Sequence, residues 1–283
     1  MTSRIIAVGN LKGGTGKSTV AVNLACRLAE SQAVTLVDAD PQGTAAAWLE
    51  GGQAKGMPRL LEVVSRPLRE AAGSGPWQAE MCARRHHYGR IVIDLPPQKG
   101  EAFQAALRVA DLLIVPVTPS AVDLHATAQA IAVLHRMRGQ RDGRPACLLV
   151  PSRVDRRLAQ GRKAGALLEK LGCEVASALA QRASHVDAFS AAAWIGAHAP
   201  GTPAHDDICT LAREVEDQLA RCPAPEPFVP AALRADATRA GTGPVPAIAA
   251  GLVGFVALLR PRLRRPDLGS LLRLRPSASL RQP

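Results

Sequence analysis

The chain has 283 residues, of which 47% are hydrophobic, enough to build one large α/β domain with an appendage. Aromatic residues make up 3%, which argues against a surface that binds single strands by stacking bases on rings. The net charge of +11 favours a polyanionic partner such as DNA or an acidic membrane surface. Arginine supplies 29 of the 35 basic residues, so an arginine-rich composition explains this charge equally well.

Six cysteines are scattered along the sequence without a C-x-x-C pair. This distribution is typical of reduced thiols, and it favours neither a disulfide framework nor a zinc site. The first twenty residues have the pattern of a strand and a glycine-rich loop, not that of a signal peptide. We therefore expect a cytoplasmic protein.

Predicted strands and helices alternate along the first 221 residues. Strands are predicted at 4–8, 33–37, 60–64, 90–94, 112–116, 145–150 and 174–179. Helices are predicted at 17–30, 43–50, 67–87, 101–109, 120–138, 156–171, 184–194 and 204–221. Several strands are continuously apolar, as in Leu112–Val115, which indicates a sheet covered on both faces. The predicted fold class is α/β: a doubly wound, mostly parallel sheet with helices on both faces.

The composition changes abruptly at Pro223, because four of the eight residues at 223–230 are proline. We predict a folded α/β domain over 1–222 and a Pro/Arg/Ala-rich tail over 223–283 that is disordered or weakly helical. The tail holds nine arginines and three acids, so it carries +6 of the total charge. Its apolar run at 247–259 is shorter than the roughly 20 residues that span a bilayer as a helix. A segment that lies on a surface or binds a partner is the alternative.

A glycine-rich loop follows the first predicted strand. It reads KGGTGKST over 12–19 and fits the phosphate-loop pattern G-x-x-x-x-G-K-[ST], with a shifted start and a second lysine, Lys12. A strand, a glycine-rich turn and a helix N-terminus together present backbone N–H groups to phosphate. The predicted nucleotide-binding residues of this loop are Gly13, Gly14, Thr15, Gly16, Lys17, Ser18 and Thr19.

Two side chains of the loop have chemistry suited to a nucleoside triphosphate. Lys17 can reach the β- and γ-phosphates as a point charge, and Ser18 can place its hydroxyl on Mg²⁺. The sequence therefore predicts binding of a triphosphate together with magnesium.

Carboxylates stand at the ends of two further strands. Asp38 and Asp40 end the second strand, and Asp94 ends the fourth. Open α/β sheets bind ligands at the carboxyl ends of their strands, and an acid there suits a water-bridged magnesium contact. Taken alone, Asp38 or Asp94 has the equally good interpretation of a helix cap or turn residue. Their order after the loop favours a functional role.

These motifs resemble the ParA-type partition ATPases, within the deviant-Walker group that also holds MinD-like proteins. The matching segments are KGGTGKST (12–19), DADPQG (38–43), IVIDLPP (91–97), PVTPSAVDLHA (116–126) and, more weakly, QRASHVDAF (181–189). The resemblance spans about residues 3–220 and is greatest to the small plasmid-type members.

The resemblance implies roles for individual residues. Lys12 corresponds to a signature lysine that reaches across a nucleotide-sandwich dimer, so Lys12, Lys17 and Asp40 form the expected catalytic set. Asp40 corresponds to the carboxylate that positions the attacking water. Ser18, Asp38 and Asp94 correspond to groups around Mg²⁺, and Arg153 lies where the family often contacts adenine. Arg182 falls in a loop similar to one implicated in the dimer or DNA surface, and a plain solvated arginine is an equally good interpretation.

For the whole chain, the resemblance implies an ATPase for plasmid or chromosome segregation. ATP and Mg²⁺ would form a homodimer that binds nonspecific DNA of the nucleoid, and a ParB-like partner on the cargo would trigger hydrolysis.

Three other function classes have less support. A MinD-like positioner would use a membrane surface, but prolines interrupt the expected basic amphipathic end at 260–283. Relatives of the nitrogenase iron protein hold a cluster through a cysteine soon after the Asp94 strand, and no cysteine lies between Cys82 and Cys147. Amide-forming ligases have similar loops, but membership of this class would not explain the DPQG segment at 40–43.

Overall fold

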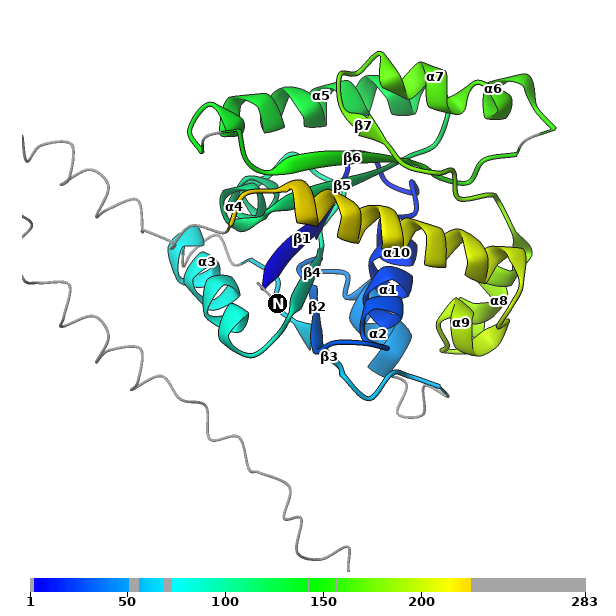
Figure 1. Cartoon of the computed structure of the whole chain (residues 1–283). Helices are drawn as coiled ribbons and strands as arrows, with labels where there is room; N and C mark the ends of the chain where they lie inside the picture. The colour runs from blue at the N-terminus through cyan, green and yellow to red at the C-terminus, as the bar shows by residue number, and fades with distance from the viewer. Residues whose placement is uncertain (1–2, 51–55, 69–72, 142, 156, 225–283) are drawn as a thin grey trace, which may run out of the picture. The chain divides into compact units, whose positions relative to one another are not determined.

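The computed structural model describes residues 3–224, apart from 51–55, 69–72, 142 and 156. The predicted tail from 225 onward lies outside the described residues, so the proposed division at residue 222 stays a prediction. The folded part is a single sheet with helices on both faces (Figure 1).

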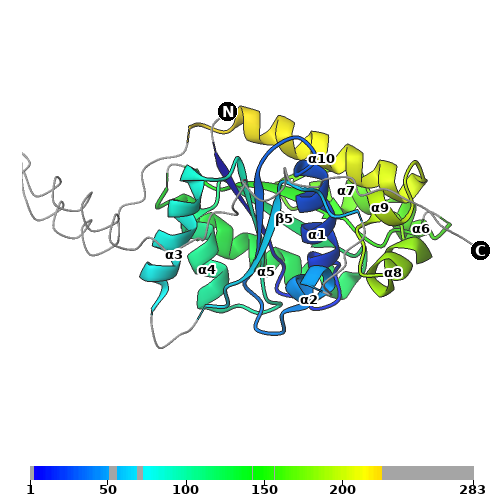
Figure 2. The same ribbon diagram turned by 90° about the horizontal axis from the view of Figure 1, so that it is seen from below.

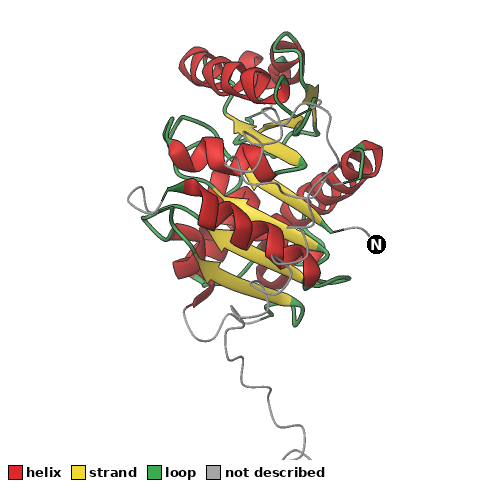
Figure 3. Ribbon diagram, turned by 90° about the vertical axis from the view of Figure 1, so that its left-hand side faces the viewer, coloured by secondary structure: helices red, strands yellow, loops and turns green. Residues whose placement is uncertain are grey.

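The sheet of the described region has seven strands, all paired in parallel. Its strands are coloured yellow in Figure 3. The strands are β1 (Arg4–Val8), β2 (Val34–Asp38), β3 (Leu61–Ser65), β4 (Arg90–Asp94), β5 (Leu112–Val117), β6 (Ala146–Pro151) and β7 (Glu174–Val175). Their order across the sheet is β3-β2-β4-β1-β5-β6-β7. The predicted α/β doubly wound fold is thereby confirmed.

Helices connect these strands. They are α1 (Lys17–Leu28), α2 (Thr44–Glu50), α3 (Ser74–Ala83), the 3₁₀ turn η2 (Arg84–His86), α4 (Glu101–Val109), α5 (Ala121–Arg138), α6 (Ala159–Arg162), α7 (Ala164–Glu169), α8 (Ala183–Ser190), α9 (Ile195–His198) and α10 (Pro203–Arg221).

Two predicted helices are broken in the structure. The helix predicted at 156–171 is divided into α6 and α7 at Lys163, whose φ of −99° and ψ of 4° leave the helical region. Glycines at 161 and 165 flank this break and weaken a continuous helix. The helix predicted at 184–194 ends at Ser190, because Ala192 has a positive φ of 49° that turns the chain into α9. The strand predicted at 174–179 keeps only its first two residues as β7.

Alternate residues of each strand pack into two separate cores. One face carries Ile6, Val8 and Leu36 beneath α1, α2 and α10, and the other carries Ile5 and Ala7 beneath α3, α4 and α5. Figure 2 shows the fold from below, with α1 and α10 lying apart from α3 and α4. Burial on both faces explains why the strands are apolar throughout.

The arrangement of β1 determines where a ligand can bind. β1 lies between β4 and β5. The chain leaves β1 toward β2 on one side of the sheet and leaves β4 toward β5 on the other side, so a crevice opens at the carboxyl ends of β1 and β4. The register pairs Val8 with Asp94 and Asp94 with Asp38. Two carboxylates from distant parts of the sequence therefore stand side by side next to the start of the glycine-rich loop.

Candidate nucleotide-binding site

The loop between β1 and α1 needs glycine at two positions. Gly14 has a φ of 76° and Gly16 a φ of 91°, a region that residues with a Cβ rarely adopt. A Cβ built on Gly16 would lie 2.8 Å from Ser152 Oγ, which is closer than real contacts allow. Gly16 also begins α1 without a side-chain cap, so the first N–H groups of this helix remain available to an anion.

Lys17, the first residue of α1, holds its ammonium group beneath this loop. The residue is 7% exposed, and Nζ donates a hydrogen bond to Lys12 O at 3.0 Å. Burial lowers the pKa of Lys17 from its ordinary value, while the nearby charges of Asp94 and Asp40 raise it. The cation is thus positioned by the loop itself and by carboxylates on the neighbouring strands.

Asp94 is a fully buried acid without a partner of normal hydrogen-bond geometry in the described structure. Burial, above all, raises its pKa to about 7; the charge of Asp38 adds to this, and the Ser18 hydroxyl and the Lys17 ammonium oppose it. Buried carboxylates are normally paired or bound to a metal. Asp94 and the Ser18 hydroxyl therefore fit the oxygen donors that Mg²⁺ prefers beside a phosphate.

Asp38 is equally buried, but both of its oxygens are occupied. Oδ1 accepts from Asp40 N at 3.0 Å, and Oδ2 accepts from Ala46 N at 2.8 Å in the first turn of α2. Asp38 thus holds the turn that carries Asp40. The side chain of Asp40 is partly exposed and lines the pocket, and its Oδ1 accepts from Gln42 N at 2.9 Å.

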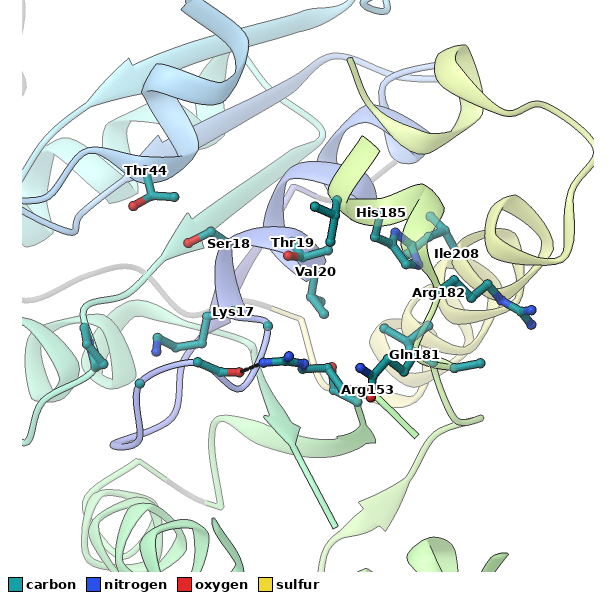
Figure 4. A pocket seen from close by; sticks show the side chains of 18 of the residues that line it. Lys17, Ser18, Thr19, Val20, Thr44, Arg153, Gln181, Arg182, His185 and Ile208 are labelled. Atoms are coloured by element: carbon teal, nitrogen blue, oxygen red, sulfur yellow. Dashed lines mark hydrogen bonds between the residues drawn. The ribbon is translucent and has the colours of Figure 1, made fainter. Parts of the chain in front are cut away.

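A pocket of about 680 Å³ opens over the loop (Figure 4). It is lined by Gly13, Gly14, Gly16, Lys17, Ser18, Thr19, Val20, Asp40, Thr44, Pro97, Ser152, Arg153, Leu179, Ala180, Gln181, Arg182, Ala183, His185, Val186 and Ile208. The structure thus brings most of the predicted loop residues together with Asp40 and Arg153. Lys12, Asp38 and Asp94 do not line it: the two acids lie below the loop, and Lys12 is exposed.

In the described part of the chain, the side chain of Lys12 is not held by other side chains or by the loop backbone, unlike that of Lys17. Its side chain is exposed, and its ammonium group makes no ion pair or hydrogen bond within the described residues. The two lysines of the motif therefore occupy different environments, one fixed under the loop and one directed outward.

Two arginines predicted near the pocket have definite positions. Arg153, with a positive φ of 55°, donates from Nη1 to Gly14 O at 3.0 Å, so its guanidinium lies against the phosphate loop. Figure 4 shows this bond as a dashed line. Arg182, at the far end of the pocket, pairs with Asp207 at 3.2 Å. Neither position tests the predicted adenine or dimer contacts.

Several residues that line the pocket were not predicted from the sequence. His185 on α8 is the most distinctive, because its Nδ1 is buried without a hydrogen-bond partner in the described region. Burial lowers the pKa of His185 below its ordinary value, and the charge of Asp207 opposes this. The segment 181–189 resembled the family weakly, but no spacing in it indicated which side chain would face the pocket.

A model of the CobQ/CobB/MinD/ParA nucleotide-binding domain matches residues 6–190. The chain belongs to this family. The prediction of a ParA-type ATPase is thereby confirmed at the level of the family, as is the prediction that the chain binds a nucleotide.

Curated relatives carry two kinds of name. Two "maintenance of carboxysome distribution protein A" sequences match: that of Gloeobacter kilaueensis is 42% identical over 47% of this chain and 56% of its own length. That of Halothiobacillus neapolitanus is 31% identical over 62% of this chain and 79% of its own. The chromosome-partitioning ATPase Soj of Thermus thermophilus is 32% identical over 48% of this chain and 63% of its own. Two of these matches span less than two thirds of the relative.

Solved structures agree on the fold. The Cyanothece McdA–ATP complex superposes with a TM-score of 0.66 at 15% identity, covering 81% of this chain and 99% of that chain. In the part of the chain that the structure describes, no helix has the length and apolar character needed to cross a bilayer. The roles of individual residues, the magnesium ion and the partners remain predictions.

Proposed function

We propose that this protein is an ATP-driven positioning ATPase that forms a dimer on ATP, binds nonspecific DNA and releases it on hydrolysis. The observation that supports this best is the contrast between the two lysines of one loop. Lys17 is buried under the loop, whereas Lys12 is exposed and unpaired within the described residues. An exposed cation next to a phosphate site is better placed to contact the nucleotide of a second subunit than the nucleotide of its own subunit.

The loop and the strand ends supply the groups that hold ATP. The amides of 13–19 and the Lys17 ammonium would bind the phosphates at the start of α1. Mg²⁺, held by Ser18 and Asp94, would neutralise phosphate charge. Asp38 acts through the turn it fixes, since its two oxygens are already engaged by backbone N–H groups.

Asp40 and Lys12 are proposed to perform the chemistry with Lys17. The partly exposed Asp40 carboxylate lines the pocket and can orient the attacking water. Lys12 from a second copy would stabilise the charge that develops on the γ-phosphoryl group, much as an arginine finger does. Hydrolysis would then require a dimer.

DNA is proposed as the surface on which this switch works. The charge of +11, of which the tail at 223–283 carries +6, suits phosphate contacts that ignore base sequence. The relatives named for carboxysome distribution and for chromosome partition support two classes of cargo, a carboxysome and a chromosome. In both cases a partner protein on the cargo, ParB-like where the cargo is DNA, would stimulate hydrolysis, and the protein would act at the nucleoid in the cytoplasm.

Binding to a nonspecific DNA duplex tests the proposal. We expect binding in the presence of ATP and Mg²⁺, steeply weakened by salt because arginines displace counterions from phosphates. The Lys17→Ala variant, which lacks the phosphate-binding cation, should not bind DNA in an ATP-dependent way. DNA binding that is independent of both ATP and salt would contradict the proposal.

The same protein should be sedimented with liposomes of anionic lipid. ATP-dependent sedimentation with liposomes, combined with no ATP-dependent DNA binding, would replace DNA with a membrane surface as the working platform. A version ending at residue 222 then shows whether the tail is needed for either surface.

A further inference from the structure

Two of the scattered cysteines become neighbours in the sheet. Cys147 is the second residue of β6, and Cys173 directly precedes β7. The parallel register pairs Leu148 with Glu174 and Leu149 with Val175, so one step back it places Cys147 beside Cys173. Neighbouring strands lie about 4.8 Å apart, within the Cα separations that disulfides span.

The two thiols also point to the same face of the sheet. Cys147 belongs to the core formed with Leu149 and Leu168, and Cys173 packs against that same core with Val175. The intervening residue Leu148 belongs to the opposite core, as the alternation of side chains requires. Cys147 is 3% exposed, and Cys173 is partly exposed.

The two thiols have different ionisation. The interaction of each thiol with the other is the largest influence on its ionisation: it raises the pKa of Cys147 and lowers that of Cys173 to about 7, with the charge of Arg138 adding to the second effect. Cys173 is therefore the more accessible and the more nucleophilic of the pair at neutral pH.

We propose that Cys147 and Cys173 form a thiol pair that a disulfide oxidant, such as oxidised glutathione, converts into a bridge between β6 and β7. The Cys173 thiolate attacks one glutathione sulfur, forms a mixed disulfide and releases one glutathione. Cys147 Sγ then attacks the Cys173 sulfur and releases the second glutathione. Two protein thiols are oxidised, one glutathione disulfide is reduced, and the two protons end on the two glutathione thiols.

The bridge would fix the weakest strand of the sheet. β7 has two residues and lies at the edge, so it is paired on one side only; backbone bonds from Ala176 N to Leu149 O and from Leu179 N to Pro151 O, both 2.8 Å, continue the contact with β6. Beyond β7 the chain runs to the 179–183 segment, which lines the nucleotide pocket. A covalent link at the opposite end of β6 and β7 would limit local opening of this edge.

Peptide mapping of the native full-length protein tests the pair. After treatment with oxidised glutathione and blocking of remaining thiols, we expect a linked Cys147–Cys173 peptide by mass spectrometry without reduction. In the Cys147→Ala variant the resolving thiol is missing, so glutathione should remain on Cys173. The Cys173→Ser variant should give no link, whereas Cys209→Ser, which removes another partly exposed thiol, should leave the link unchanged.

Hydrogen exchange supplies a second measurement. The amide of Ala176, which donates to Leu149 O of β6 at 2.8 Å, should exchange more slowly in the bridged protein than in the reduced protein, and reduction should reverse this. A wild-type protein in which Cys173 keeps a stable glutathione adduct, or in which the link joins other cysteines, would overturn the proposal. Unchanged exchange at Ala176 in a fully bridged sample would overturn the proposed effect on the edge strand.

Discussion

Replacing Asp94 with asparagine tests whether the ionised form of this buried carboxylate destabilises the folded protein. Its pKa lies at about 7 in the folded protein, against 3.8 for an ordinary aspartate. Since the folded state binds the proton more tightly, the stability that protonation provides is fully present below about pH 4 and is lost as the pH rises through about 7. At about 1.4 kcal/mol per pH unit, the wild-type protein should lose about 2–3 kcal/mol between pH 5 and pH 8 from this group.

The Asp94→Asn variant has the same shape but cannot ionise. In urea unfolding followed by tryptophan fluorescence, with a chelator present and no nucleotide, its stability relative to wild type should therefore rise by about 2–3 kcal/mol from pH 5 to pH 8. Burying the asparagine amide has a cost that does not depend on pH, so it changes the difference in unfolding free energy between variant and wild type by the same amount at every pH. A difference between variant and wild type that stays constant over this range, with equal denaturant slopes, would refute the reasoning.

Three further substitutions and one matched control probe the site and its support. Lys17→Ala should abolish binding of a fluorescent ATP analogue, because the ammonium held under the loop is lost; retained affinity would contradict its role. Gly16→Ala should cost about 1–2 kcal/mol of stability from the positive φ alone and should also weaken ATP binding. Gly165→Ala, in α7 with open space around it, is the matched control and should be neutral or stabilising by about 0.5–1 kcal/mol. Asn23→Ala should cost about 1–3 kcal/mol in urea unfolding, since it leaves the buried Ile195 amide without its acceptor at 2.7 Å; a loss below this range would show that water replaces the side chain.

Local patterns were sufficient for most of the fold. Apolar runs bounded by turn residues located all seven strands, and the KGGTGKST segment located the loop between β1 and α1. That Asp38 and Asp94 lie at the ligand-binding end of the sheet also followed from the sequence, because both end predicted strands of a parallel sheet, whereas their direct pairing across β2 and β4 did not. These features depend on residues close in sequence or on a general rule of sheet topology.

Other features depend on contacts between distant segments. Both oxygens of Asp38 accept hydrogen bonds, from Asp40 N and from Ala46 N, whereas neither oxygen of Asp94 has a partner within the described residues. This difference depends on the packing of α2 against the sheet, which the sequence does not reveal. Cys147 and Cys173 are brought together by the register of β6 and β7, which no cysteine spacing encodes. The break at Lys163 could have been suspected from its flanking glycines, but helical periodicity outweighed them.

The measurement that tests the central claim most directly is ATP turnover by a mixture of two inactive variants. Lys12→Ala keeps its own Asp40 but lacks the exposed lysine, and Asp40→Ala keeps the lysine but lacks the carboxylate. If Lys12 acts on the ATP of a partner, a mixed dimer contains one complete site, so turnover should reappear on mixing and increase with the concentration of the second variant. Turnover that stays at the level of the separate variants at every ratio, under conditions where both bind ATP, would contradict a lysine shared between subunits.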